Sequence, residues 1–176
     1  MPDLIAPTAR LYAPWFEAHR EWGPGLHEDG FGLRESDDVD SPVGFAAWVG
    51  RLIAESDSAA AEGDRPGCTY RWIVEGDQVL GGIALRHGLD DFVQWAGHIG
   101  FGIRPSARGR GLATWALARV LEVADQRGVD RVLVVCAIDN LASARVIERN
   151  GGEFEGPGET PLGPSRRYWI TTGGIR

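Results

Sequence analysis

Residues 100–113 constrain the fold of this chain more than any other segment. They read Gly-Phe-Gly-Ile-Arg-Pro-Ser-Ala-Arg-Gly-Arg-Gly-Leu-Ala. An apolar strand ends at Ile103, a loop containing proline follows, and a helix opens at Leu112. Glycines let the backbone approach a ligand closely, the loop N–H groups point inward, and the helix N-terminus adds positive potential. The segment therefore predicts a cradle for an anion, and a pyrophosphate fits it well.

A second informative segment follows the helix that begins at Leu112. Residues 132–138 are apolar throughout, as expected for a strand that is covered on both faces. Asn140 then stands where it can cap a helix, which stops at residues 150–152, Asn-Gly-Gly. Together the two segments predict a β-α-β passage followed by another helix.

These two segments resemble the cofactor motifs of the GNAT superfamily of acyl-CoA-dependent N-acetyltransferases. Residues 103–113 hold Ile-Arg-Pro and then Arg-x-x-Gly-x-Ala, which is similar to the superfamily's loop Arg/Gln-x-x-Gly-x-Gly/Ala. Residues 140–143, Asn-Leu-Ala-Ser, look like its second motif, Asn-x-x-Ser/Ala. The likeness covers residues 97–152, with weaker similarity back to about residue 70 and forward to residues 166–170. The first 65 residues carry little of it.

The resemblance implies that acetyl-CoA is the cosubstrate and that no metal takes part. The N–H groups of the cradle would hold the pyrophosphate, and Arg108 and Arg110 would add charge. The pantetheine arm would pair with backbone groups at Phe101 and Ile103, one of which would also face the thioester oxygen, while Asn140 would bind the arm from the other wall. The implied cofactor residues are Phe101, Ile103, Arg108, Gly109, Arg110, Gly111, Leu112, Ala113, Asn140 and Ser143.

His98 is the candidate general base. Several relatives carry a carboxylate at the matching point of this strand, and an imidazole with an ordinary pKa near 6.5 can take an ammonium proton through water. Simple alternation places His98 on the face opposite to Phe101 and Ile103, so a buried structural histidine is the alternative. Other candidate bases are Glu28, Asp29, Asp90 and Asp91.

The candidate acid departs from the family pattern. Many relatives carry a tyrosine in the middle of the helix after Asn-x-x-Ala, and Ile147 stands at that point here. Ser143, one turn after Asn140, is the nearest hydroxyl and would donate a hydrogen bond to the leaving sulfur. The alternative for Ser143 is a residue at a helix start that bonds only to backbone.

Two other functions stay open at this point. Gly109-x-Gly111 after a strand resembles part of a dinucleotide fingerprint, but position 114 is threonine instead of the third glycine and the loop is too long for the tight turn. A non-catalytic acyl-CoA-binding protein that kept the cradle and lost the acid is the alternative to an acetyltransferase with direct attack in a ternary complex.

Composition narrows the partners. The net charge is −7 and all 18 basic residues are arginine, which excludes a catalytic lysine and disfavours nucleic-acid binding. Residues 23–40 form an acidic segment that favours a cationic amine, either a small molecule or a protein N-terminus. The chain has no apolar run of membrane-spanning length and no visible secretion signal, and its two cysteines are far apart. We therefore expect a cytoplasmic protein, with a homodimer left open.

The expected fold is one domain over residues 1–176, a mixed α+β, mostly antiparallel central sheet with helices on both faces. This agrees with the GNAT-like fold that the resemblance implies. Expected strands are 3–5, 69–75, 79–86, a long one from the turn at 88–91 to 103, 132–138, 153–155 and 166–170. Expected helices are 14–22, 42–53, 112–127 and 140–150, and expected loops are 23–40, 57–67 and 156–165.

Overall fold

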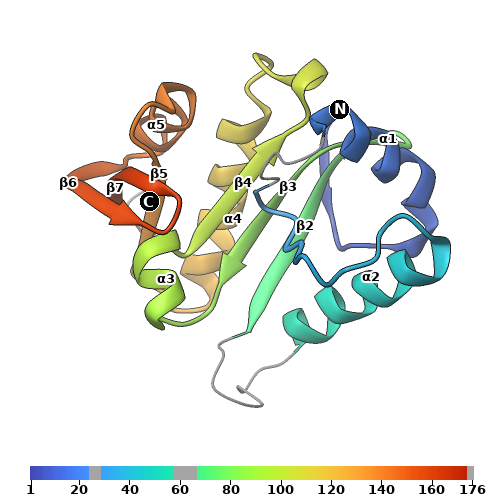
Figure 1. Ribbon diagram of the computed structural model, residues 1–176. Helices are drawn as coiled ribbons and strands as arrows, with labels where there is room; N and C mark the ends of the chain where they lie inside the picture. Colours follow the sequence, from blue (N-terminus) through green and yellow to red (C-terminus); the bar gives the residue numbers. More distant parts are fainter. Residues whose placement is uncertain (24–28, 58–66, 174–176) are drawn as a thin grey trace.

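One mixed sheet with helices on both faces forms the protein (Figure 1). The computed structural model describes residues 1–23, 29–57 and 67–173. In these residues the strands are β1 (Asp3–Ile5), β2 (Cys68–Glu75), β3 (Gln78–Arg86), β4 (Ile99–Ile103), β5 (Arg131–Ala137), β6 (Glu153–Thr160) and β7 (Gly163–Thr171). The helices are α1 (Tyr12–Trp22), α2 (Pro42–Asp57), α3 (Asp91–Ala96), α4 (Leu112–Gln126) and α5 (Leu141–Arg149), with 3-10 turns η1 (Ala9–Leu11) and η2 (Pro105–Ala107).

The sheet runs in the order β1-β2-β3-β4-β5-β7-β6. Neighbouring strands are antiparallel except β4 and β5, which are parallel. In the described chain these two strands share one registered pair, Ile99 with Val134, and then separate. Figure 1 shows them diverging toward the end of the sheet at which α5 begins. The expected mixed, mostly antiparallel sheet is confirmed.

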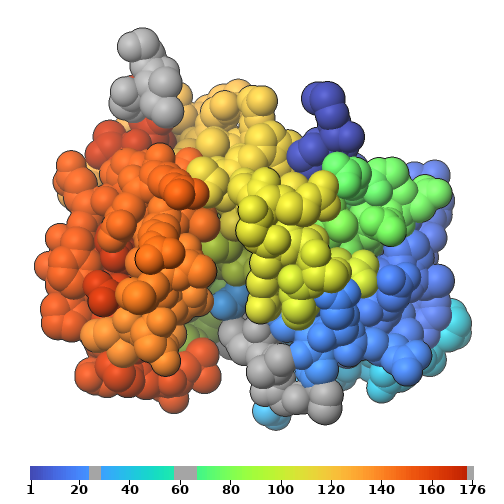
Figure 2. Space-filling view, turned by 90° about the horizontal axis from the view of Figure 1, so that it is seen from above, coloured from blue at the N-terminus to red at the C-terminus, as the bar shows by residue number. Residues whose placement is uncertain are grey.

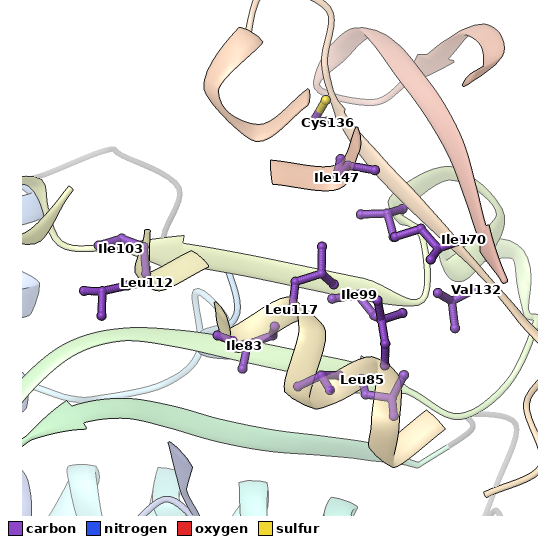
Figure 3. Close-up of a cluster of buried hydrophobic side chains, with 14 of the residues drawn as sticks. Ile83, Leu85, Ile99, Ile103, Leu112, Leu117, Val132, Cys136, Ile147 and Ile170 are labelled. Carbon is purple, nitrogen blue, oxygen red and sulfur yellow. The ribbon is translucent and has the colours of Figure 1, made fainter. Parts of the chain in front are cut away.

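Two apolar clusters hold the helices against the sheet. On one face, α4 and α5 cover a cluster that includes Ile83, Leu117 and Ile147 (Figure 3). On the other face, α1 and α2 bury an aromatic cluster in which Trp48 stacks on Trp72 and packs against Trp15. Helices therefore cover both faces, as expected.

The expected long strand between residue 88 and Ile103 is wrong in its first half. Residues 91–96 form α3 instead, because the Asp90 side chain accepts a hydrogen bond from the Val93 N–H and caps the helix. Gly97, with φ of 84°, then ends α3 and turns the chain into β4.

The expected loop at 156–165 is also wrong. β6 and β7 form a hairpin whose pairing continues to Thr160 and Gly163. The register shifts between Phe154 and Gly156, and Pro157 is tolerated because β6 is the edge strand. The expected loops 23–40 and 57–67 lie partly outside the described residues. The candidate base Glu28 lies wholly outside them.

No helix in the described ranges is long and apolar enough to cross a membrane.

Candidate active site

The predicted anion cradle lies between β4 and α4. Gly109 and Gly111 both have a φ of +76°, a conformation that favours glycine, and Gly111 directly precedes the first residue of α4. A Cβ added at either glycine would meet no atom within 4 Å, so the mouth of the cradle is open. The first N–H groups of a helix have no partner within the helix. Leu112 and Ala113 therefore present N–H groups to this open space.

The two arginines of the cradle are bound by the chain itself. The Arg108 Nε donates to the Ile103 carbonyl at 3.0 Å. The Arg110 guanidinium forms an ion pair with Glu75 at 2.8 Å, and both side chains are partly exposed. These contacts fix the loop, and the Arg108 N–H also donates to the Pro105 carbonyl at 3.3 Å.

A buried arginine clamps the start of this loop to α1. Arg104 is 7% exposed, and its guanidinium pairs with Glu21 at 2.5 Å and with Glu17 at 3.1 Å. Glu21 also accepts hydrogen bonds from the Ser106 N–H and hydroxyl. Burial opposes ionisation of Glu21, but the bonds from Ser106 and Arg104 outweigh it and lower the pKa of Glu21 below its ordinary 4.5.

The lowered pKa of Glu21 makes the clamp sensitive to acid. The folded state binds this proton less readily than the unfolded state, so the stabilisation is present above pH 4.5 and is lost as the pH falls through the folded pKa. We expect Glu21→Gln to lower the free energy of unfolding at pH 7 by about 1 kcal/mol. The difference from wild type should shrink toward pH 3. Melting temperatures measured from pH 7 to pH 3 test this.

Glu17→Gln is the matched control for that measurement. Glu17 is mostly exposed and pairs with the same guanidinium, so its melting curve should follow wild type across the range. A constant offset between Glu21→Gln and wild type at every pH would contradict the linkage.

A cavity of about 670 Å³ opens where β4 and β5 separate. Seen from above, the surface is hollowed between the yellow segment after β4 and the orange segment that contains α5 (Figure 2). The lining residues used below come from β4 (Gly100, Phe101), β5 (Cys136), α5 and its cap (Asn140, Ser143), the β2–β3 hairpin (Tyr70, Arg86), and the segments around α2 and α3 (Asp29, Arg34, Glu55, Asp90, Trp95). Three of the predicted cofactor residues, Phe101, Asn140 and Ser143, thus share one cavity.

The registered pairing of β4 with β5 is described only at Ile99, so the backbone of β4 beyond that residue borders this cavity. The Arg86 N–H donates to the His98 carbonyl at 2.7 Å, and the Arg104 N–H donates to the Leu80 carbonyl at 2.8 Å. In an antiparallel ladder alternate residues direct their backbone groups to opposite sides, so the odd-numbered residues of β4 face β5. The N–H of Phe101 therefore points into the gap where β5 has turned away.

The other wall of the cavity is the start of α5. The Asn140 Oδ1 accepts a hydrogen bond from the Ser143 N–H at 3.1 Å, as the expected cap requires. The amide NH₂ of Asn140 is then left to donate to a ligand. The Ser143 hydroxyl has no hydrogen-bond partner among the described residues. Ile147 is fully buried in the core beside Cys136 (Figure 3), so a side chain at that position does not reach the cavity here.

His98 is buried at the base of the gap and does not line the cavity. The ring Nδ1 of His98 accepts a hydrogen bond from the Leu133 N–H at 2.9 Å, and the backbone N–H of His98 donates to the Leu133 carbonyl. Burial and the charge of Arg86 lower the pKa of His98 below 6.5, so the ring is neutral at pH 7. A neutral ring with an accepting Nδ1 carries its proton on Nε2 and has no lone pair left for another proton. These contacts support a structural role, a bracket that joins β4 to β5.

Of the described aspartates that the sequence offered as candidate bases, two line the cavity and one does not. Asp29 and Asp90 line the cavity, whereas Asp91 is exposed outside it. Asp90 is engaged in capping α3. The backbone carbonyl of Asp29 lies against β4, because a Cβ added to Gly102 would come within 2.8 Å of it.

Asp37 and Asp38 of the acidic segment are bound within the chain. Asp37 pairs with Arg51 at 2.6 Å, and Asp38 accepts a hydrogen bond from the Ser41 hydroxyl at 2.8 Å. Glu55, which lines the cavity, forms an ion pair with Arg34 at 2.9 Å and accepts a hydrogen bond from the Tyr70 hydroxyl at 2.7 Å. The electrostatic argument for a cationic acceptor is correspondingly weakened.

Sequence reasoning missed three cavity residues, Tyr70, Glu55 and Arg86. They belong to a strand, a helix and a strand end whose local patterns carry no functional signal. In the described part of the chain, no three His, Cys, Asp or Glu side chains gather where they could hold a metal ion.

Comparison with known proteins agrees with this geometry. The family model described as "Acetyltransferase (GNAT) domain" matches residues 40–153. Solved structures with a similar fold include RimJ from Mycobacterium smegmatis in complex with a CoA disulfide, with a TM-score of 0.76, 17% identity, and coverage of 99% of this chain and 83% of that chain. No curated protein matches the sequence.

Two further structures show the same fold. Ribosomal-protein-S5-alanine acetyltransferase from Vibrio fischeri has a TM-score of 0.74 at 13% identity, with 99% of this chain and 95% of that chain covered. The microcin C7 self-immunity acetyltransferase MccE, in complex with acetyl-CoA and AMP, has a TM-score of 0.71 at 15% identity, with 97% and 92% covered.

Proposed function

This chain belongs to the GNAT acetyltransferase family, and on that premise we propose that it transfers the acetyl group of acetyl-CoA to a primary amine by direct attack in a ternary complex. The observation that carries the proposal is that the cavity and the anion cradle lie along the same strand, β4. The anion cradle follows this strand at its end, and the cavity opens beside Phe101 in the middle of it.

The described residues fit acetyl-CoA at both ends. The cradle is open and offers backbone N–H groups and a helix N-terminus to a pyrophosphate. The gap beside β4 offers the N–H of Phe101 and, across the cavity, the amide of Asn140 to a pantetheine arm. Bound acetyl-CoA supplies an acetyl thioester, and the N–H of Phe101 is placed to stabilise negative charge on its oxygen.

We assign proton removal from the amine to Asp29 in preference to His98. Asp29 lines the cavity beside Gly102 of β4, whereas the ring of His98 lies outside the cavity with its accepting nitrogen occupied. Asp29→Asn is expected to lower kcat/KM for the amine about 100-fold, because a general base contributes by that order. Acetyl-CoA affinity should be unchanged. Steady-state kinetics with calorimetry measure both.

Asp90→Asn is the matched control for the base. Asparagine caps a helix as well as aspartate does, so this variant keeps α3 and removes the second cavity carboxylate. Its kcat/KM should stay near wild type. A lower kcat/KM in Asp90→Asn with no change in Asp29→Asn would identify Asp90 as the general base. A lower kcat/KM in His98→Asn alone would identify His98 as the general base.

We assign protonation of the departing thiolate to Ser143. Its hydroxyl lies on the α5 side of the cavity and has no hydrogen-bond partner among the described residues. The acceptor is an amine of a small molecule or of a protein N-terminus. The names of the similar structures include both a ribosomal-protein acetyltransferase and a self-immunity enzyme, which supports an amine of either kind. Both cysteines are free, which supports action in the reducing cytoplasm.

Calorimetric titration with acetyl-CoA, with NADH as the control ligand, tests the proposal first. We expect saturable 1:1 binding of acetyl-CoA and none of NADH. Release of free thiol is then measured against a broad panel of amines. Binding without turnover of any amine would favour the non-catalytic acyl-CoA-binding protein, and tight binding of NADH would favour a dinucleotide protein.

A further inference from the structure

Arg86 lines the cavity and is held against β4. Its Nη1 donates to the Gly97 carbonyl at 2.9 Å, and its guanidinium lies 5.0 Å from the centre of the Phe92 ring. A Cβ added to Gly100 would be 3.2 Å from Nη2, so the guanidinium covers the bare backbone of that glycine. Gly100 immediately precedes Phe101, whose N–H points into the gap. The cation is therefore fixed one residue from the place assigned to the reacting carbonyl.

The charge of Arg86 is not neutralised by the described part of the chain. Arg34, which lines the same cavity, pairs with Glu55, and nearby Arg51 pairs with Glu55 and Asp37. No carboxylate in the described ranges lies within 4.0 Å of Arg86, although Asp29 and Asp90 line the same cavity. A guanidinium has five N–H donors, and the side chain of Arg86 donates one hydrogen bond to a described residue. The remaining donors suit a carboxylate or a phosphate.

An aspartate and an arginine thus line the cavity on either side of the reacting position. The backbone carbonyl of Asp29 lies against Gly102, and the guanidinium of Arg86 lies over Gly100, so the two residues flank Phe101 on the same strand. Successive residues of a strand are about 3.4 Å apart, so Gly100 and Gly102 lie about 7 Å apart along β4. An amine that carries its own anionic group a few bonds away would match both charges.

We infer that Arg86 binds an anionic group of the acceptor, so that the preferred acceptor is an amine with a carboxylate or phosphate close to its amino group. This rests on the proposed acetyl transfer and names the substrate class for the same site. It also reverses the expectation from the acidic segment, because a polyamine brings a second positive charge to Arg86.

Matched pairs of amines test the inference. The pairs are L-alanine with L-alaninamide, the peptides Ser-Asp-Ala-amide with Ser-Asn-Ala-amide, and phosphoethanolamine with ethanolamine, with spermidine as the cationic probe. These pairs separate a free α-carboxylate, an acidic side chain and a phosphate as sources of the anion. For at least one pair, wild type should show a kcat/KM about tenfold or more higher for the anionic member. Spermidine should be a poor acceptor.

The variant Arg86→Gln removes the charge and keeps a donor for the Gly97 carbonyl. It should lose the preference for the anionic amine and leave kcat/KM for the neutral partner and the Kd for acetyl-CoA unchanged. Arg86→Lys should restore part of the preference. Arg34→Gln is the control, because Arg34 already pairs with Glu55, and it should keep the wild-type preference.

Direct binding keeps the test independent of turnover. Each amine is titrated by calorimetry into the protein saturated with CoA, so a failure of catalysis is seen separately as absent thiol release. Weaker binding of the anionic member in Arg86→Gln supports the inference even if no amine is acetylated. Equal binding of both members of every pair by wild type, or a preference that survives in Arg86→Gln, overturns it.

Discussion

Replacing Gly111 by glutamate is expected to weaken acetyl-CoA binding about 100-fold, which corresponds to about 2.7 kcal/mol. Gly111 has a φ of +76° and directly precedes α4, where the backbone N–H groups converge. A side chain at this point enters open space, so it meets no atom of the protein. The loss of affinity therefore has two sources. One is a carboxylate in the volume assigned to the pyrophosphate, and the other is the strain of a residue other than glycine in the left-handed conformation. Calorimetric Kd values measure it.

Gly111→Ala separates these two contributions. Alanine carries the same backbone strain and no charge, so its Kd should lie within about fivefold of wild type. Melting temperatures of both variants show whether the fold is retained. If Gly111→Glu binds acetyl-CoA as wild type does, the cradle is not the pyrophosphate site. If alanine weakens binding as much as glutamate does, the backbone conformation and not the charge is responsible.

The cradle and the cap at Asn140 could be predicted because each depends on a short stretch of sequence. Glycines with positive φ and a helix start are local features, and they stand where residues 109–112 and 140–143 indicated them. The apolar strand β5 was predictable for the same reason. Its apolar run predicts cover on both faces, and residues 132–134 are buried in this way, whereas Val135 lines the cavity and Ala137 is exposed.

The two errors in the expected elements have different causes. Residues 90–96 hold an N-cap aspartate, a second acidic residue in the first turn and a following glycine, a pattern that favours a short helix over a strand. The hairpin of β6 and β7 was hidden by its glycines and prolines. Pro157 would break a central strand but is accepted in β6 because β6 is the edge strand, and edge position depends on topology.

The acceptor side of the site could not be predicted from the sequence because it is assembled from distant segments. Arg86 covers Gly100 only because β3 and β4 are neighbours with Ala84 opposite Gly100. The bracket made by His98 depends on β5, which lies more than thirty residues further along the chain. Alternation along the strand gave no sign of the Leu133 N–H that occupies the ring nitrogen of His98.

Loss of the Ser143 hydroxyl is expected to lower kcat about 100-fold, the usual order for a positioned proton donor. Ser143 lies on the cavity wall one turn into α5, while the position that carries tyrosine in many relatives is occupied by the fully buried Ile147. In the proposed mechanism, the hydroxyl of Ser143 is therefore the donor for the leaving sulfur. Ser143→Ala should keep the Kd for acetyl-CoA within about twofold, because the cap at Asn140 uses the backbone N–H of residue 143.

Ser143→Thr is the matched control, since it keeps a hydroxyl at the same position and should recover most of kcat. Single-turnover thiol release with a good amine acceptor measures the chemical step apart from product release. A kcat for Ser143→Ala equal to wild type would show that the thiolate leaves without help from this side chain, as a stable thiolate can at high pH. The pH profile distinguishes these cases, because a donor matters most below the pKa of the departing thiol, and the deficit of the alanine variant should shrink as the pH rises above it.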